Sequence, residues 1–434
     1  MTADFPPVND SPWRDLWSLD PQITFLNHGS FGACPIAVLK QQQIVRQQLE
    51  AEPLRFFEDA YEPLLDRSRL ALSKRIGASP EELAFVSNAT TGINTVLRSL
   101  SFRAGDELLT TNHEYNACRN ALDFVAATWG AKVVVAEIPF PLDSDESFGA
   151  SSAEQMTQQI SEQMTAAVMA RLTERTRLVL VDHVTSQTGL IFPIRSLAQQ
   201  LRALGIDLLV DGAHAPGMVP LNLKELGVTY YTGNCHKWLC APKGAAFLYV
   251  RAEKQSLIRP LVISHGANSV RTDRSRFHLE FDWTGTADPT PYCCVADAIE
   301  FFNSLVPQGW NGVMAHNHQM VIQARQILCD ALRVSSPCPE SLLGSMASIP
   351  LPKGFAPELQ RQLFDRFGIE VPLIPWQTYS GQNKSQYGDR LVRISAQLYN
   401  SLADYHRLAE ALLTLLAEAN RSSVQLAQGI DLEN

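Results

Sequence analysis

Lys237 and Asp211 are the residues of this sequence whose types and surroundings best fit covalent chemistry. Lys237 stands in TGNCHKWLCAPKG, between two apolar runs typical of strands and beside His236 and Trp238. These neighbours predict an enclosed amine, and burial lowers the pKa of a lysine. A lysine with a lowered pKa is suited to forming a Schiff base with a carbonyl group.

Asp211 ends the apolar run IDLLVDG, which predicts a buried strand with a carboxylate at its carboxyl end. Open α/β sheets bind their ligands at that edge, although a helix cap or a turn is the ordinary alternative for such an aspartate. An amine for an aldehyde and a carboxylate for a ring nitrogen are the two protein groups that pyridoxal 5'-phosphate (PLP) requires. Together, the two residues predict a PLP site.

The segment FVSNATTGINTVLRSL predicts an anion site close to the same edge. An expected strand ends at Ser87, and Ala89, Thr90 and Thr91 open a helix whose free N–H groups and dipole attract a phosphate. Helix capping alone would also explain these hydroxyls. The segment lacks the GxxxxGK[ST] pattern of a nucleotide P-loop, so the phosphate of the cofactor is the expected ligand.

The composition excludes several other classes of protein. The 36 basic and 45 acidic residues give a net charge of −9, which predicts no nucleic-acid partner. No apolar run approaches the ~18 residues that span a bilayer, and the N-terminus lacks a secretory signal, so we expect a cytoplasmic protein without membrane contact. The eight cysteines form no C-x-x-C pair and predict reduced thiols. His316 and His318 lack further ligands at metal-binding spacing, so no metal is expected.

Apolar runs alternate with helical stretches through the middle of the chain, which predicts an α/β fold with a largely parallel sheet covered on both faces. We assign residues 55–295 to this large domain. Residues 296–434 predict a small α+β domain, and residues 1–54 are expected to pack against it. The seven expected strands lie at 83–87, 107–111, 131–138, 177–184, 206–212, 229–233 and 245–250.

These features resemble the class V aminotransferases, PLP-dependent enzymes that include cysteine desulfurases and kynureninase. Five further stretches are most similar to the isopenicillin N epimerase branch, and their order along the chain makes the resemblance specific. They are FLNHGSFGACP, HVTSQTGLIFPI, EFDWTGTADPTPY, IEVPLIPW and RISAQLYNS. The resemblance implies the PLP-dependent transferase fold type I, with a mostly parallel seven-stranded sheet and a small C-terminal domain.

The resemblance also implies roles for residues around the cofactor. Lys237 matches the lysine that bonds to PLP, Asp211 matches the partner of the pyridine nitrogen, and His214 matches a catalytic residue beside the phenolic oxygen. Stacking on the cofactor ring is assigned to Tyr115, with His113 as the alternative. The other implied cofactor ligands are Ala89, Thr90, Thr91, Asn234, His236 and Ser186, which replaces an asparagine of the desulfurases.

Two further positions concern the substrate and the partner subunit. Arg393 in VRISAQLYN matches the arginine that binds the substrate α-carboxylate, a bidentate interaction suited to a guanidinium. Asn27 and His28 in FLNHGSFG are the other implied substrate-binding residues. Thr286 matches a residue that the family donates to the phosphate site of the neighbouring subunit, which implies a homodimer.

The expected reaction takes place at the α-carbon of an amino acid, where epimerisation, transamination and β-elimination use the same groups. Residues 369–393 contain no cysteine, whereas cysteine desulfurases need a catalytic cysteine there. The resemblance favours an isopenicillin N epimerase-like enzyme, and a C–S β-lyase acting on a cysteine derivative is the alternative. A non-catalytic protein of this fold would have lost the lysine or the aspartate, and a nicotinamide-dependent enzyme would need GxGxxG.

Overall fold

The structure is a computed structural model that describes residues 10–142, 152–376 and 387–430. Its centre is a seven-stranded sheet. The strands are β2 (Leu83–Val86), β3 (Glu107–Thr111), β4 (Lys132–Ala136), β5 (Thr176–Asp182), β6 (Asp207–Asp211), β7 (Tyr230–Asn234) and β8 (Ala246–Val250). They lie in the order β2-β8-β7-β6-β5-β3-β4, and only β8 runs antiparallel to its neighbours. The mostly parallel sheet expected from the sequence is confirmed.

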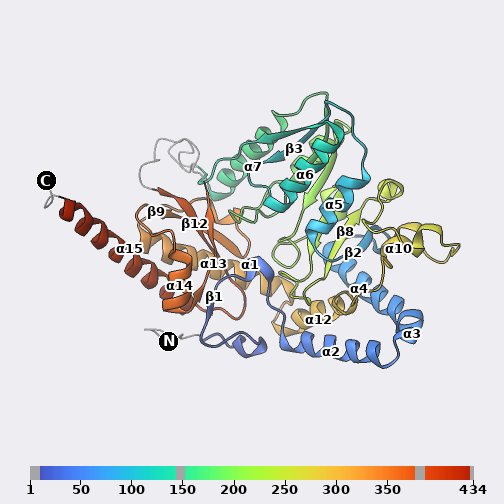
Figure 1. Cartoon of the computed structure of the whole chain (residues 1–434), viewed down its shortest axis with the longest axis horizontal. Coiled ribbons are helices and arrows are strands. Elements are labelled where there is room, and N and C mark those ends of the chain that lie inside the picture. The colour runs from blue at the N-terminus through green and yellow to red at the C-terminus, as the bar shows by residue number, and fades with distance from the viewer. Residues whose placement is uncertain (1–9, 143–151, 377–386, 431–434) are drawn as a thin grey trace.

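Helices cover both faces of this sheet because its central strands are apolar on both sides (Figure 1). One face carries α5 (Ala89–Ser99), α6 (Asn116–Trp129) and α10 (Arg276–Phe281), and the other carries α7 (Ala153–Met169) and α8 (Ile194–Ala203). In β5, Leu178 and Leu180 pack with the first group of helices, while Val179 and Val181 pack with the second. Such strands are buried on both faces, so ligands reach the sheet only at its ends.

The C-terminal part of the chain forms a three-stranded antiparallel sheet. Its strands are β9 (Met346–Pro352), β11 (Leu373–Pro375) and β12 (Tyr387–Ser395), in the order β11-β12-β9. Three helices accompany this sheet, namely α13 (Trp310–Leu332), α14 (Leu359–Phe367) and α15 (Leu402–Ile430). Helix α13 packs on β9 and on α15. Figure 1 shows this group at the opposite end of the molecule from α5 and α6.

The stretch IEVPLIP is divided between two strands. Its first residues form β10 (Ile369–Glu370), and its last residues form β11. Pro372 lies between them and lacks the N–H group that a continuous ladder would need. The Pro372 carbonyl instead accepts a hydrogen bond from the Arg393 amide at 3.2 Å, which aligns β12 beside it.

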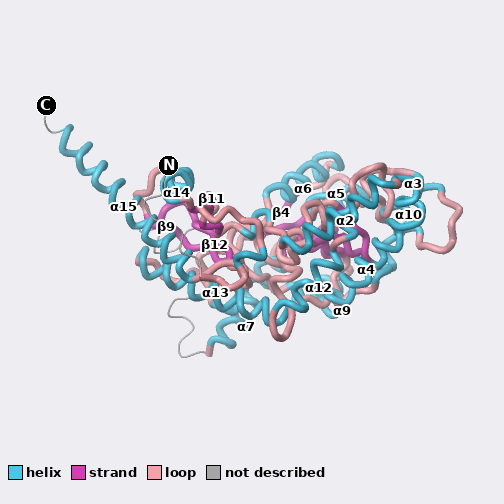
Figure 2. The backbone as a smooth tube through the Cα atoms, turned by 90° about the horizontal axis from the view of Figure 1, so that it is seen from below, coloured by secondary structure: helices cyan, strands magenta, loops and turns pink. Residues whose placement is uncertain are grey.

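The N-terminal residues connect the two sheets. β1 (Thr24–Phe25) pairs in parallel with β10 of the C-terminal part. The short helix α1 (His28–Phe31) follows immediately and lies between the two groups of strands in Figure 1. Figure 2 shows the same two groups of strands from below, joined by helices and loops. The N-terminus is thus placed to contribute residues to a site between the sheets.

Four helices close the side of the large sheet that carries β2. They are α2 (Ile36–Ala51), α4 (Tyr61–Ile76), α11 (Thr290–Cys293) and α12 (Val295–Leu305). α12 packs on both α2 and α4, so the expected boundary at 295/296 falls in the first turn of a helix that contacts the large domain. Two shorter helices, α3 (Pro53–Arg55) and α9 (Leu223–Leu226), lie in connections.

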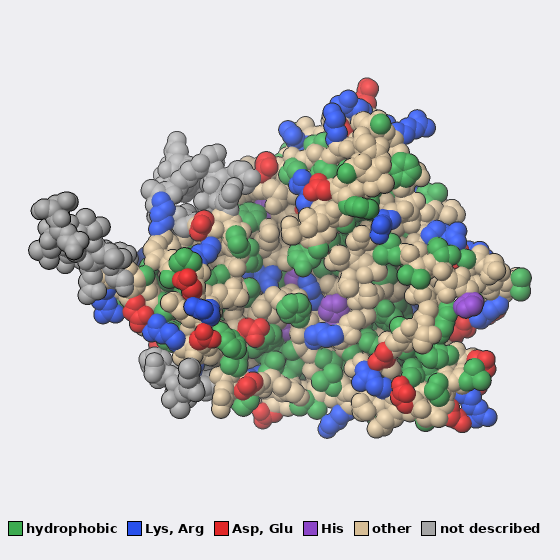
Figure 3. All heavy atoms as spheres, viewed as in Figure 1, with side chains coloured by type: hydrophobic (Ala, Val, Ile, Leu, Met, Phe, Trp, Pro, Cys, Tyr) green, Lys and Arg blue, Asp and Glu red, His purple; other side chains and the backbone are tan. Residues whose placement is uncertain are grey.

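The surface and the thiols agree with the composition. Lys, Arg, Asp and Glu side chains are interspersed over the face shown in Figure 3, without a continuous basic patch. Within the three described ranges, no helix combines the length and apolarity needed to cross a bilayer. All eight cysteines are buried free thiols.

Candidate active site

The carboxyl edge of the large sheet brings the predicted residues together. Asp182 ends β5 and Asp211 ends β6, and the two are partners in the parallel register. β7 ends at Asn234, and the turn that follows carries Lys237 to the same edge. Burial lowers the pKa of Lys237 and raises that of Asp211, and the two groups are close enough that the charge of each opposes the shift of the other.

The turn that carries Lys237 is fixed by backbone hydrogen bonds. The amides of Cys235 and His236 donate to the Ala245 carbonyl, each at 3.0 Å, and the Cys240 amide donates to the Lys237 carbonyl at 3.1 Å. Cys240 has a φ of +55°, a conformation that costs a residue with a Cβ about 1–2 kcal/mol. A residue keeps such a strained conformation only where the surrounding structure fixes its backbone, as the hydrogen bonds of this turn do.

Helix α1 packs directly against this turn. A Cβ atom on Gly32, whose φ is +71°, would lie 2.2 Å from the His236 carbonyl oxygen, so the contact requires glycine. His28 places Nε2 3.0 Å from the Lys237 carbonyl and Nδ1 2.8 Å from the Tyr399 hydroxyl. Both ring nitrogens are thereby used within the protein. The implied role of His28 as a substrate ligand therefore needs correction, because the residue supports the backbone of Lys237.

His214 lies between Trp238 and the amine of Lys237. The indole N–H donates to Nδ1 of His214 at 3.3 Å, and Nε2 lies 3.1 Å from Nζ of Lys237. Because Nδ1 accepts a hydrogen bond, the ring proton belongs on Nε2, and the lysine accepts it as a neutral amine. Burial lowers the pKa of Lys237 to about 8, and the charge of Arg393 adds to this effect. The hydrogen-bond geometry suits the free base, and the lowered pKa brings that form closer to neutral pH than in an ordinary lysine.

Asp211 is enclosed and accepts two hydrogen bonds. The Cys118 thiol donates to Oδ2 at 3.1 Å, and the Ala213 amide donates to Oδ1 at 2.9 Å. Burial raises the pKa of Asp211, while these two bonds and the charge of Lys237 lower it. A cation bound at this carboxylate would stabilise its ionised form further. Neither Cys118 nor Trp238 was singled out as a site residue from the sequence.

The start of α5 forms the anion site expected from the sequence. The Asn88 side chain caps the helix by accepting from the Thr91 amide at 2.8 Å, and the Asn234 side chain accepts from the Ala89 amide at 2.9 Å. Asn234 therefore orients the helix, where the resemblance implied a direct phosphate ligand. The Thr90 amide has no hydrogen-bond partner in the described part of the chain, so it is the N–H group of this turn left for an anion.

His236 follows β7 beside this helix. Its Nδ1 lies 2.9 Å from the Ala245 carbonyl, so that nitrogen carries the ring proton and Nε2 holds a lone pair. Burial lowers the pKa of His236 to about 4. His236 can donate to a phosphate only as an imidazolium, and a nearby phosphate would favour that form by raising the pKa.

Arg393 of β12 is buried without a carboxylate partner among the described residues. One terminal nitrogen donates to the Ser186 carbonyl at 2.6 Å, and the other donates to the Ser30 hydroxyl at 2.9 Å and the Asn27 side chain at 3.3 Å. Nε has no hydrogen-bond partner within the described ranges. Burial lowers the pKa to about 10, which still leaves the guanidinium charged at neutral pH. An unpaired buried cation is costly, so this group is arranged to bind an anion.

The partners of Arg393 revise two expected roles and add one residue. Asn27 was expected at the substrate and Ser186 at the cofactor, but both place an oxygen on the guanidinium and position it. Ser30 does the same and was missed. Ser30 could have been found from its spacing. It lies three residues after Asn27, the N-cap of α1, and side chains three residues apart share one face of a helix.

Of the two candidates for stacking on the cofactor ring, Tyr115 has the exposed side chain and His113 the buried one. His113 is buried, with Nδ1 2.8 Å from the Thr188 hydroxyl and Nε2 3.0 Å from the Ile138 carbonyl. Tyr115 begins α6, is 42% exposed, and lies near enough to Arg393 to affect the pKa of the guanidinium. The structure therefore favours Tyr115 for stacking, because the ring of His113 is enclosed in the protein.

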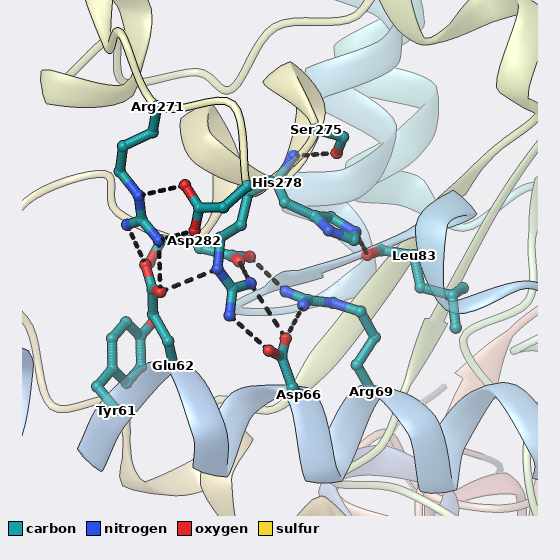
Figure 4. A network of polar contacts seen from close by, with 11 residues as sticks. Tyr61, Glu62, Asp66, Arg69, Leu83, Arg271, Ser275, His278 and Asp282 are labelled. Carbon is teal, nitrogen blue, oxygen red and sulfur yellow. Dashed lines mark hydrogen bonds and ion pairs between the residues drawn. The ribbon is translucent and has the colours of Figure 1, made fainter. Parts of the chain in front are cut away.

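Thr286 is exposed in the loop between α10 and α11. The neighbouring residues Thr284 and Gly285 line a depression of about 330 Å³ together with Ser87 and Thr91 of the anion site. An ion-pair network anchors the segment that leads into this loop (Figure 4). In that network, Glu62 of α4 binds Arg271 at 2.7 Å and Arg274 at 2.9 Å.

These features define a class of protein. A buried amine with a lowered pKa, a carboxylate facing it and a free helix N-terminus fit the aldehyde, ring nitrogen and phosphate of PLP. A family model described as aminotransferase class-V matches residues 37–408. The chain belongs to the class-V aminotransferase family and is a PLP-dependent enzyme of fold type I.

Known proteins of this family match nearly the whole chain. The isopenicillin N epimerase of Amycolatopsis lactamdurans is 33% identical, over 93% of this chain and 97% of its own. A probable chloroplastic L-cysteine desulfhydrase of Arabidopsis thaliana is 30% identical, over 92% and 84%. The solved structure of a C-DES mutant, with glycine covalently linked to its PLP cofactor, shares the fold at a TM-score of 0.70 and 20% identity, over 91% and 97%.

Proposed function

We propose that this enzyme acts at the α-carbon of an amino acid whose α-carboxylate binds to Arg393. The observation that carries the proposal is the buried guanidinium without a carboxylate partner beside Lys237. The two groups are close enough for the charge of Arg393 to lower the pKa of the Lys237 amine. A carboxylate bound to Arg393 therefore places the neighbouring α-carbon close to the amine.

The described residues divide the work at this carbon. PLP supplies the electron sink that stabilises the negative charge left when the α-proton departs. Lys237, as a neutral amine, accepts that proton, and His214 orients the amine through its Nε2–H. Asp211 provides the negative charge that faces the ring nitrogen. Arg393 orients the substrate without taking part in the proton transfer.

Epimerisation is the first candidate for the outcome. It requires a second group that returns a proton to the face of the α-carbon opposite Lys237. The phenol of Tyr115 is the candidate, because it is half exposed and lies near Arg393. Support also comes from the relatives named isopenicillin N epimerase, at 32% and 33% identity over 98% and 97% of their lengths.

β-Elimination from a cysteine derivative is the second candidate. It needs only one base at the α-carbon, and the contact between Lys237 and His214 supplies that base. Relatives named L-cysteine desulfhydrase, at 30% identity over 84–85% of their lengths, support this outcome. The lack of a cysteine in residues 369–393 argues only against desulfuration through a persulfide on the enzyme.

The outcomes are separated by a product screen. Purified enzyme loaded with PLP is incubated with a panel of L- and D-amino acids and scored for inverted substrate, keto acid and released thiol or sulfide. The variant Tyr115→Phe then tests the first candidate. Epimerisation should fall by about 10²-fold or more when the phenol is removed, whereas β-elimination should keep most of its rate. A parent enzyme that turns over no amino acid in the panel would contradict the proposal.

We further propose a homodimer in which Thr286 reaches the phosphate site of the second subunit. Leu261 and Val262 line the same depression as Thr284 and Gly285, and with the next residue, Ile263, they are exposed by 43–57%. A contiguous exposed apolar patch of this kind is typical of an interface. The interface should bury more than ~2,000 Å², as obligate dimers do. Light scattering at micromolar concentration should give a dimer, and a monomer with bound cofactor would contradict the proposal.

A further inference from the structure

Three carboxyl groups lie together beneath the site, although the reaction uses only one. Asp211 and Asp182 are register partners at the ends of β6 and β5, and Glu114 follows the end of β3. All three are buried, with exposures of 1%, 2% and 5%. Oxygens of Glu114 and Asp211 lie within 4.8 Å of each other and of the Cys118 thiol.

Among the described residues, two oxygen atoms of this cluster have no hydrogen-bond partner of ordinary geometry, although the Tyr115 amide faces both carboxyl groups. They are Oε1 of Glu114 and Oδ2 of Asp182. The Thr110 hydroxyl donates to the other Glu114 oxygen at 3.1 Å. Burying a carboxylate with an unpaired oxygen removes its water of hydration without replacing the lost hydrogen bonds. The free-energy cost of burying a neutral carboxyl group is much smaller.

The charges that face the cluster cannot balance three anions. Lys237 is the nearest cation, and its charge stabilises Asp211 and Asp182. Arg119 lies at the edge, where it stabilises the ionised form of Glu114 but also pairs with Asp123 at 3.1 Å. The other titratable groups at the cluster are the neutral Cys118 thiol and Tyr231 phenol. One enclosed cation is therefore matched by one anion.

We propose that Glu114 and Asp182 remain protonated in the folded enzyme and act as positioning residues, so that Asp211 carries the single negative charge of the cluster. The inference rests on the proposed function in one respect, since it places the PLP ring nitrogen at Asp211. Because both acids are neutral, the electric field at the ring nitrogen stays close to the field of a single carboxylate. They also keep the Cys118 hydrogen bond directed at Asp211.

The electrostatics agree with this assignment. Burial, followed by the charges of neighbouring carboxylates, raises the pKa of Glu114 and of Asp182 well above the ordinary range. The raised pKa means that the folded enzyme keeps protons that the unfolded chain releases above its ordinary pKa. Folding then weakens as the pH rises, by tenfold in the equilibrium constant per pH unit for each retained proton.

The direct test is an infrared difference spectrum of the full-length, PLP-loaded enzyme at pH 7. The parent minus Glu114→Gln should contain a protonated-carboxyl band, and parent minus Asp182→Asn should contain another. Glu107 of β3 provides the matched control. It is equally buried, but it binds Thr173 and Arg175, which lower its pKa. Parent minus Glu107→Gln should therefore contain carboxylate bands only, and carboxylate bands for Glu114 and Asp182 would overturn the proposal.

A second measurement uses urea unfolding of the same proteins between about pH 5.5 and 7.5. The folding constant of Glu114→Gln relative to the parent should rise about tenfold per pH unit, while that of Glu107→Gln relative to the parent should stay flat. A flat ratio for Glu114→Gln, with stability that increases on adding Na⁺, K⁺ or Mg²⁺, would show a bound cation in place of the protons. Both readouts are independent of turnover, so failure of the proposed reaction leaves them interpretable.

Discussion

Two buried arginines of this chain have opposite surroundings. Arg69 of α4 lies between Asp66 and Asp282, inside the network of ion pairs shown in Figure 4. Arg393 of β12 contacts neutral oxygens, such as the Ser186 carbonyl and the Ser30 hydroxyl. Their exposures are 2% and 4%, so burial does not explain the difference.

The difference separates charges that stabilise the fold from charges that bind a ligand. The Asp282 side chain is only 7% exposed, and its pKa is raised by burial while Arg69 opposes that rise. Removing Arg69 would leave this anion with Arg274 as its remaining arginine partner, at 3.4 Å. Removing Arg393 would leave no charge unpaired, because its counterion is expected from the substrate. We therefore expect loss of Arg69 to impair folding and loss of Arg393 to impair substrate binding.

The largest effect should come from the other buried cation of the site. Lys237→Ala removes the amine that binds the cofactor aldehyde and carries the α-proton, so turnover should fall by ~10³-fold or more. Borohydride treatment followed by peptide mapping should fix PLP on the peptide of Lys237 in the parent and not in the variant. Lys243→Ala, in the same loop, is the control and should keep the attachment. Attachment of PLP to Lys243 would refute the assignment.

Arg69→Ala should produce the largest loss of stability. It leaves the Asp282 carboxylate with Arg274 alone, at 3.4 Å, which should lower the free energy of unfolding by about 3 kcal/mol, the low end of the range for a broken buried pair. Urea unfolding measures this change. Arg271→Ala, in the exposed part of the same network, should cost only about 0.2–1 kcal/mol. Equal losses from the two variants would show that Asp282 does not depend on Arg69.

Arg393→Ala should reverse this pattern. Loss of a charge-assisted bidentate pair costs about 2 kcal/mol or more, so substrate affinity should fall by about 30-fold or more. The free energy of unfolding should change far less than in Arg69→Ala. Spectral titration with a substrate amino acid, together with urea unfolding, tests both halves. A variant that saturates as readily as the parent would place the carboxylate elsewhere.

Trp238→Phe should have the smallest effect. It keeps an aromatic ring against His28 but removes the N–H that fixes the proton of His214 on Nε2. Loss of one hydrogen bond of about 0.5–1.5 kcal/mol should lower kcat about 2–12-fold, with substrate affinity nearly unchanged. An unchanged kcat would mean that the tautomer of His214 has no influence on the amine.

Most of the fold could be predicted from the sequence because its strands are short, apolar and regularly separated. The seven runs expected as strands correspond to β2 through β8, and Asp211 lies at the end of its strand as expected. The division of IEVPLIP was not predicted, since it depends on Pro372 facing the Arg393 amide from a distant strand. Pairing of β1 with β10 is equally non-local.

The site was predictable where a residue acts through its own chemistry, as Lys237 and Arg393 do. It was less predictable where a residue acts through another. His28, Asn27 and Ser186 were assigned to ligands, yet their polar atoms contact Lys237 or Arg393. The sequence does not reveal such contacts, because segments more than 100 residues apart make them. Asp182 offered a usable signal, since RLVLVD and IDLLVD end in the same way.

The central claim is that Lys237 removes the α-proton of an amino acid held by Arg393. Proton NMR in D₂O measures this step directly, because exchange at the α-carbon erases its signal whatever the final product. The PLP-loaded parent should exchange the α-proton of at least one amino acid in the panel, and Lys237→Ala should not exchange it. A parent that leaves every α-proton in place, or a Lys237→Ala variant that exchanges as fast as the parent, would contradict the account.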